Sequence, residues 1–171
     1  MARIEQLSLE DGSKVKVNRE STVEIAFTSE ERRVYLTKGE ASFEVAKDLA
    51  RPFIVNVAGV DVRAVGTIFN VKLTQKEVYV IVSEGKVNVR TISSGFQTNE
   101  TVSDSLLEIG QRAKVDLGSE SPMVEITTLN QSEFIDATRW QPRLLNFDAT
   151  QLHEIVDEFN NSNPIQIVLG D

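Results

Sequence analysis

The sequence predicts a mainly β protein, in which an all-β, repeat- or sandwich-like domain of short antiparallel strands precedes a small β-α-β unit. Three observations predict it. Apolar and polar residues alternate over residues 4–118, glycines separate the alternating runs, and a helical stripe of apolar residues appears only near the C-terminus. With 171 residues the chain is long enough for one medium or two small domains with a hydrophobic core.

Each alternating run places β-branched or aromatic residues on one face of an expected strand, which is typical of half-buried antiparallel strands. Val15 and Val17, for example, alternate with lysines. The other runs are Val23, Ile25 and Phe27; Phe43 and Val45; Phe53, Val55 and Val57; Val60, Val62 and Ala64; Phe69, Val71 and Leu73; Val78, Val80 and Val82; Val87 and Val89; and Ala113, Val115 and Leu117.

Glycines open several of these runs, with two apolar residues following one position apart. We interpret this as a degenerate repeat of turn plus strand, in which each glycine supplies the positive φ of a tight turn. Ordinary turns between the strands of a sandwich explain the pattern equally well. The glycines concerned are Gly12, Gly39, Gly66, Gly85 and Gly110.

Changes in composition mark the expected boundaries. Residues 91–105 are polar and aperiodic, which predicts a long exposed loop, and the Gly-Ser-Glu-Ser-Pro sequence at 118–122 ends the alternation. We therefore expect an all-β domain over residues 1–118, a connecting segment over 119–139 and a small, incomplete β-α-β unit over 140–171.

The C-terminal unit is predicted from a helix signal between two short apolar runs. Asp148 and Gln151 have the spacing of a capping box. The residues Leu152, Ile155, Val156 and Phe159 then recur at helical spacing, and Asn160-Asn161-Ser162-Asn163-Pro164 ends the helix. The flanking strands are expected at Leu145-Asn146-Phe147 and at Ile165, Ile167 and Leu169.

Composition excludes several classes of function. The net charge of −8 disfavours nucleic acid and anionic membranes as partners, and the longest basic run is Arg32-Arg33. The chain contains no cysteine, which excludes disulfides and thiolate metal sites. No apolar run approaches the roughly 18 residues of a membrane-spanning helix, and no signal-peptide pattern follows Met1.

The sequence gives little support for catalysis, and we expect no enzyme activity, no cofactor and no metal. The only histidine, His153, lies on the expected helix, where a solvated or interface role is favoured over that of a ligand or base. Catalytic elbow, P-loop and dinucleotide motifs are absent from the sequence. The paired carboxylates Glu30-Glu31 and Asp157-Glu158 are interpreted as solvated.

Five short motifs occur in a characteristic order in the β region. They are Asp11-Gly12-Ser13, Lys38-Gly39-Glu40-Ala41, Arg51-Pro52-Phe53, Val65-Gly66-Thr67 with Phe69-Asn70-Val71, and Glu84-Gly85-Lys86-Val87. In this order they resemble the periplasmic domain of FecR-type anti-sigma regulators. The tail, with Arg139-Trp140, Leu145, Phe147, Leu152, Ile155 and Phe159, resembles the start of the secretin and TonB short N-terminal domain of proteobacterial members.

For the motif residues the resemblance implies scaffold roles. Turn glycines are expected at Gly39, Gly66 and Gly85, core aromatics at Phe43, Phe53 and Phe69, and a strand-entry proline at Pro52, with Glu40 and Thr67 in the same motifs. The fold would then carry the function.

The resemblance implies the soluble, periplasmic, signal-receiving part of a single-pass inner-membrane protein of a Gram-negative bacterium. Its partner would be the periplasmic signalling domain of a TonB-dependent outer-membrane receptor for an iron siderophore. An extracytoplasmic-function sigma factor would be reached only through a cytoplasmic part that this sequence lacks. The alternatives are a naturally complete cytosolic protein and a periplasmic carbohydrate-binding or structural β module.

We expect the partner to bind the C-terminal unit, because an incomplete small sheet leaves strand edges and apolar surface uncovered. The same surface leaves room for a homodimer. The helix stripe packing only on its own strands is the simpler alternative. The candidate residues are Leu152, Ile155, Val156, Phe159, Ile165, Gln166, Ile167 and Val168.

Overall fold

The structure, a computed structural model, describes residues 4–93, 101–119 and 122–141. All of these belong to one compact unit, which extends to Gln141, and residues 142–171 form a second unit outside the described residues. The described part is mainly β, with two sheets and the short helix α1 (Gln131–Thr138). No helix in this part of the chain is long and apolar enough to cross a membrane.

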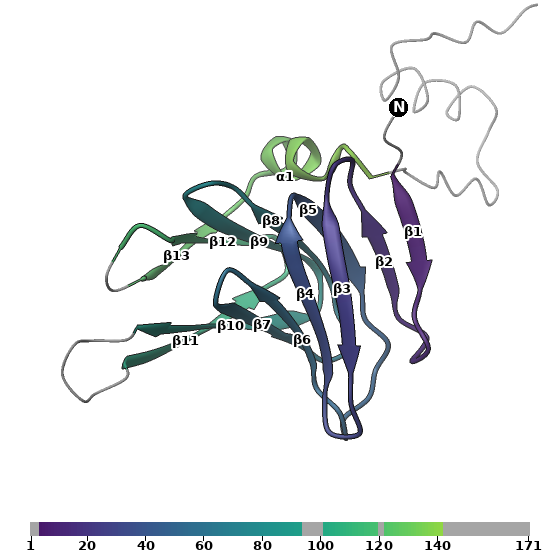
Figure 1. Ribbon diagram of the computed structural model, residues 1–171. Helices are drawn as coiled ribbons and strands as arrows, with labels where there is room; N and C mark the ends of the chain where they lie inside the picture. Colours follow the sequence, from purple (N-terminus) through teal and green to yellow (C-terminus); the bar gives the residue numbers. More distant parts are fainter. Residues whose placement is uncertain (1–3, 94–100, 120–121, 142–171) are drawn as a thin grey trace, which may run out of the picture. The chain divides into compact units, whose positions relative to one another are not determined.

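The two sheets pack face to face (Figure 1). The seven-stranded sheet is antiparallel throughout and has the order β1-β2-β5-β8-β9-β12-β13. Its strands are β1 (Glu5–Ser8), β2 (Lys14–Val17), β5 (Glu40–Glu44), β8 (Ile68–Leu73), β9 (Glu77–Glu84), β12 (Gln111–Asp116) and β13 (Val124–Thr128).

The six-stranded sheet has the order β11-β10-β7-β6-β4-β3, and it is antiparallel except for the parallel pair β4 and β6. Its strands are β3 (Thr22–Phe27), β4 (Arg32–Lys38), β6 (Phe53–Val57), β7 (Val60–Ala64), β10 (Lys86–Ser93) and β11 (Thr101–Glu108).

The chain alternates between the sheets, and glycines lie at the crossings. Gly39, Gly66, Gly85 and Gly110 each connect a strand of one sheet to a strand of the other, and all have positive φ. Gly39 and Gly85 are the only residues between their two strands. A Cβ atom at Gly39 would lie 2.2 Å from the Ser21 Oγ, so both the backbone conformation and the available space require glycine there. The positive φ predicted for the turn glycines is confirmed.

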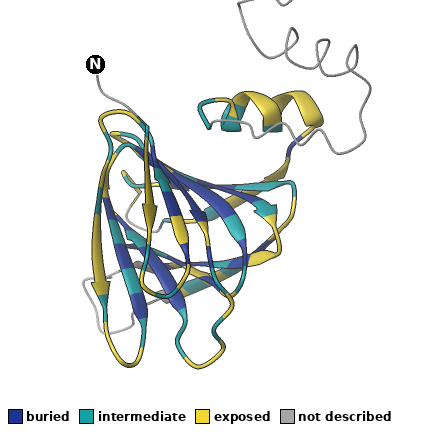
Figure 2. Ribbon diagram, turned by 90° about the vertical axis from the view of Figure 1, so that its right-hand side faces the viewer, coloured by how far each residue is buried: buried dark blue, intermediate teal, exposed yellow. Residues whose placement is uncertain are grey.

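The core lies between the inner faces of the two sheets, shown in dark blue in Figure 2. Phe43, Phe53 and Phe69 are fully buried, and the rings of Phe43 and Phe69 stack with their centroids 5.3 Å apart. Pro52 directly precedes β6, in the strand-entry position. Nearly all the apolar residues of the predicted alternating runs face this core.

The structure differs from the sequence-based expectation in three places. Residues 91–93 and 101–105, expected in a loop, belong to β10 and β11. The expected connecting segment contains β13 and α1. Ile25 is 43% exposed although its spacing predicts a core position; it lies on β3, the edge strand of its sheet.

Candidate functional site: the exit of the β domain

The strands β5 and β8 place two motif residues together on the outer face of the seven-stranded sheet, away from the core. Glu40 pairs in register with Lys72, and Ser42 with Asn70, so Glu40 and Asn70 are diagonal neighbours. The Asn70 Nδ2 donates a hydrogen bond of 2.8 Å to Glu40 Oε1. Both residues are buried although they point away from the core, at 9% and 3% exposure. Other residues must therefore cover this part of the outer face.

Part of the cover comes from the last described residues of the chain. The Gln141 Nε2 donates a hydrogen bond of 2.9 Å to the Asn70 Oδ1. The neighbouring Trp140 indole nitrogen is buried and makes no hydrogen bond of accepted geometry with a described group. It nevertheless lies close enough to the Glu40 carboxylate to favour its charged form. We call Glu40, Asn70, Trp140 and Gln141 the exit cluster, because the chain leaves the β domain there.

Burial sets the electrostatics of Glu40. Removal of the carboxylate from water raises its pKa above the usual value, and this outweighs the opposing effects of Trp140, Lys72, Asn18 and Asn70. The Asn18 Nδ2 donates to the second carboxylate oxygen, Oε2, at 3.3 Å. Both oxygens of the Glu40 carboxylate therefore accept an intramolecular hydrogen bond, and its charge is still costly in the folded protein.

The helix α1 connects β13 to the exit cluster and is held lightly. It begins with a capping box in which Asn130 Oδ1 accepts from the Glu133 backbone N–H, and the Glu133 carboxylate accepts from that of Asn130. None of the helical residues is buried. The buried Leu129 anchors the chain just before the helix, and Gln141 anchors it just after. The helix is therefore attached to the β domain mainly at its two ends, and we call this helix the strap.

A second polar region lies on the outer face of the six-stranded sheet, around Arg33. The Arg33 Nε is 2.6 Å from Glu31 Oε1, and Arg33 Nη1 is 3.1 Å from Asp61 Oδ1. A groove of about 580 Å³ runs past these residues to Arg63, Arg90 and Asp104. Three arginines therefore face three carboxylates, which leaves the groove without net charge.

The sequence-predicted residues lie in different places. Gly39, Gly66 and Gly85 form the crossings, Thr67 is buried below Gly85, and the three motif phenylalanines are in the core. The basic run Arg32-Arg33 is not a surface patch, because Arg32 is fully buried and Arg33 is paired. The expected partner-binding residues, Leu152 to Val168, and also His153, lie outside the described residues.

The exit cluster was not predicted from the sequence, although Glu40, Asn70 and Trp140 belong to three separate motifs. Gln141 and Asn70 are 71 positions apart, and no local pattern joins them. A local signal did exist for α1, because Asn130 and Glu133 have the capping-box spacing. A helix at 131–138 was therefore predictable, whereas its contact with the sheet was not.

The fold and the site define the class of this protein as a two-sheet β domain with a polar cluster at its exit. The family model described as "FecR protein" matches residues 2–88, and the chain belongs to the FecR family. No curated protein matches the chain.

Two crystal structures of a protein from Parabacteroides distasonis ATCC 8503, assigned as an anti-sigma factor, are similar to the chain. The first, at 1.65 Å resolution, has a TM-score of 0.65 and 27% sequence identity, covering 94% of this chain and 71% of the other. The second, at 2.50 Å resolution, has a TM-score of 0.62 and 26% identity, covering 94% and 70%. The likeness therefore extends over most of both chains.

Proposed function

We propose that this chain is the signal-receiving domain of an anti-sigma regulator. Its membership in the FecR family is the observation that carries the proposal, and its similarity to a protein assigned as an anti-sigma factor supports it. The role is regulatory rather than enzymatic: the domain recognises a protein partner, and other parts of the regulator act on the sigma factor.

The partner is the periplasmic signalling domain of a TonB-dependent receptor that carries an iron siderophore, and the regulator is anchored in the inner membrane. The residues proposed to bind it are those of the C-terminal unit, from Leu152 to Val168. The exit cluster supports a relay between that unit and the β domain, because Trp140 and Gln141 directly precede residues 142–171. A force on the tail would act first on the contacts with Glu40 and Asn70.

A carbohydrate-binding module, the alternative function, would need an exposed aromatic platform. The chain has one tryptophan and two tyrosines. Tyr35, Tyr79 and Trp140 are all half-buried, and Trp140 lies against Glu40 within the exit cluster. Each of the three rings is therefore partly covered, whereas a carbohydrate platform needs largely exposed rings, and this favours the regulatory function.

Calorimetric titration of the chain with the signalling domain of the receptor encoded beside it tests the proposal. We expect saturable binding, which Ile167→Asp abolishes without lowering the melting temperature of the β domain. Retained affinity in Ile167→Asp would remove that expected strand from the interface. Absence of binding by the folded chain would contradict the receptor as partner, and saturable binding of an oligosaccharide instead would favour the carbohydrate module.

A further inference from the structure

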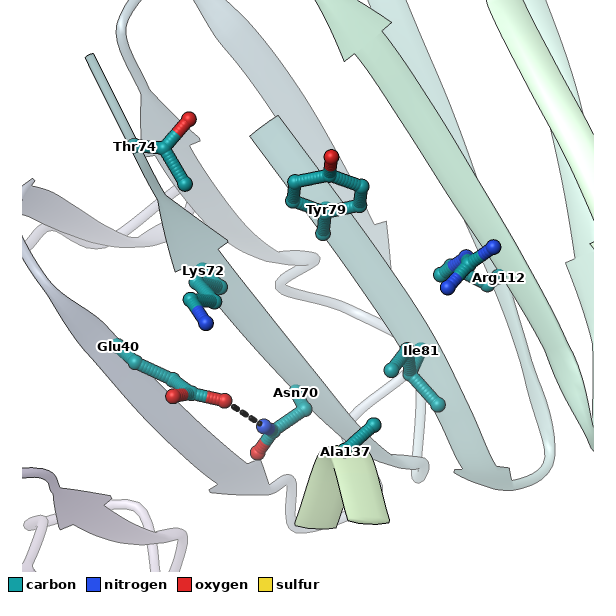
Figure 3. A pocket seen from close by; sticks show the side chains of 8 residues that line it. All are labelled: Glu40, Asn70, Lys72, Thr74, Tyr79, Ile81, Arg112 and Ala137. Carbon is teal, nitrogen blue, oxygen red and sulfur yellow. Dashed lines mark hydrogen bonds between the residues drawn. The ribbon is translucent and has the colours of Figure 1, made fainter. Parts of the chain in front are cut away.

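A cavity of about 370 Å³ opens on the outer face of the seven-stranded sheet beside the exit cluster (Figure 3). Its floor comes from β8, β9 and β12, and Ala137 of α1 contributes to its wall. This volume lies in the range of small-molecule sites, which begins at about 300 Å³. The cavity therefore has room for a compact organic molecule between the sheet and the helix.

Two cationic side chains line the cavity, and neither forms an ion pair with a described carboxylate. Neither the Lys72 ammonium nor the Arg112 guanidinium forms an ion pair or hydrogen bond with another described residue. Arg112 instead lies over the Tyr79 ring, 6.0 Å from its centroid. Lys72 favours the charged form of Glu40 only through Coulomb attraction, and the Glu40 oxygens are already hydrogen-bonded by Asn18 and Asn70. Among the described residues that line the cavity, two cations face the single carboxylate of Glu40, so this lining is net positive although the chain carries −8.

The rest of the lining is suited to a planar apolar group. Tyr79 is held in place by a short hydrogen bond from its hydroxyl to the Glu77 carboxylate, so its ring is a preorganised surface. Ile81 lies in the neighbouring cross-strand row, paired with both Asn70 and Arg112, and is only 6% exposed. The Tyr79 ring and the buried Ile81 side chain thus lie directly beside the Arg112 guanidinium.

We propose that this cavity binds a small organic anion, a carboxylate attached to a planar apolar body. Arg112 receives the carboxylate, because its planar fork matches the two carboxylate oxygens. Lys72 adds a second positive charge, and the apolar body lies against Tyr79 and Ile81. Because Ala137 and the exit cluster border the same cavity, the bound anion also contacts the strap that leads out of the domain.

The groove around Arg33 on the other sheet also contains arginines, but its charges make it a poorer anion site. Its three arginines face three carboxylates: Arg33 and Arg90 are in ion pairs, and Arg63 favours the charged form of Glu31 through Coulomb attraction, so the groove has no excess positive charge to attract an anion. Arg63 in that groove, however, has no ion pair or hydrogen bond with a described residue, and so provides a matched control for Arg112.

Benzoate and benzamidine are suitable probes, because they share a ring and carry opposite charges. The experiment follows the methyl NMR signals of Ile81 and Ala137 while either probe is added to the folded chain, up to roughly 20 mM. We expect benzoate to shift both signals saturably and benzamidine to leave them unchanged. Arg112→Gln is expected to weaken benzoate binding about tenfold or more, and Lys72→Gln severalfold, because each removes a charge-assisted contact.

Arg63→Gln should bind benzoate as the unchanged chain does. Equal binding of benzamidine, loss of binding in Arg63→Gln, or no saturable shift would each overturn the proposal. If Arg112→Gln does not fold, the benzoate affinity of Lys72→Gln tests the site instead, because Lys72 is exposed and outside the core. Undiminished affinity in that variant would then exclude this cavity. None of these outcomes depends on the receptor, so the test is separate from that of the proposed function.

Discussion

The guanidinium of Arg32 and the carboxylate of Asp11 form an ion pair of 2.6 Å in which the two side chains are 0% and 2% exposed. Arg32 also donates to the backbone carbonyls of Ala46 and Arg51, at 2.9 and 3.0 Å, and lies over the Phe53 ring. A single side chain at the start of β4 thus joins the β1–β2 turn to the segment that leads into β6. With a 3.4 Å bond from Nη2 to the Asp48 carbonyl, each guanidinium nitrogen of this fully buried cation has an acceptor.

Asp11→Asn should strongly destabilise the domain, because it leaves the Arg32 charge buried without a counterion. Breaking a buried pair in this way typically costs about 3–5 kcal/mol. Urea denaturation, followed by circular dichroism, would measure the loss. Glu44→Gln removes an exposed pair instead, Lys14 to Glu44 at 3.2 Å, and should change little. Equal effects of the two substitutions would contradict the structural role of the buried pair.

The same pair predicts loss of stability in acid. Burial alone would raise the pKa of Asp11, but hydrogen bonds from Ser13 and Arg32 together lower it below the usual 3.8. Stability from this group is therefore present above that value and is lost as pH falls through the lower, folded pKa. The Asp11→Asn variant should lack this component. A difference between it and the unchanged chain that stays constant in acid would be inconsistent with the lowered pKa.

Substitution of Gly39 should be far more costly than substitution of Gly59, although both have positive φ. At Gly59 a Cβ atom would meet nothing within 4 Å, so Gly59→Ala costs only the backbone term, about 1–2 kcal/mol. At Gly39 it would lie 2.2 Å from the Ser21 Oγ and 2.9 Å from the Ser21 Cα. We expect about 1–3 kcal/mol more for Gly39→Ala, since the backbone must move. Equal melting temperatures would refute the close approach.

Glu40→Gln should change the pH dependence of stability in the opposite sense to Asp11→Asn. Because burial raises the pKa of Glu40, its contribution is fully present below the usual 4.5 and is lost as pH rises through the folded pKa. The stability of Glu40→Gln relative to the unchanged chain should therefore increase as pH rises above 4.5. Denaturation at several pH values checks this, with Glu44→Gln on the same strand as control. A pH-independent difference would contradict the raised pKa.

The length of the β domain gives a further prediction. The change in composition at 118–122 suggests a cut after Leu117, but such a cut removes β13, which pairs with β12 over five residues, and the buried Leu129. We expect a chain ending at Leu117 to melt at a lower temperature than one ending at Gln141. Similar melting temperatures would show that β13 and α1 add nothing to the stability of the sandwich.

The alternation of apolar residues was sufficient to predict most of the core, because strands with one buried face keep a strict period of two. It failed at β11, where Ser103 and Ser105 occupy the face that carries the buried Leu107, so that the run reads as polar. The burial of Arg32 and the contacts of the exit cluster could not be predicted from the sequence either. A buried arginine has no local signature, and the bond from Gln141 to Asn70 depends on the folded sheet.

The most direct test of the account uses the single tryptophan of the chain, Trp140. Fluorine NMR of the fluorotryptophan-labelled chain would be recorded while the unlabelled signalling domain of the neighbouring receptor is added. Trp140 lies against Glu40 at the exit of the β domain. Binding of the partner should therefore shift the Trp140 resonance saturably, with the same dissociation constant that calorimetry measures. Calorimetric binding with an unchanged resonance would contradict the relay through the exit cluster, and absence of binding would contradict the receiving function itself.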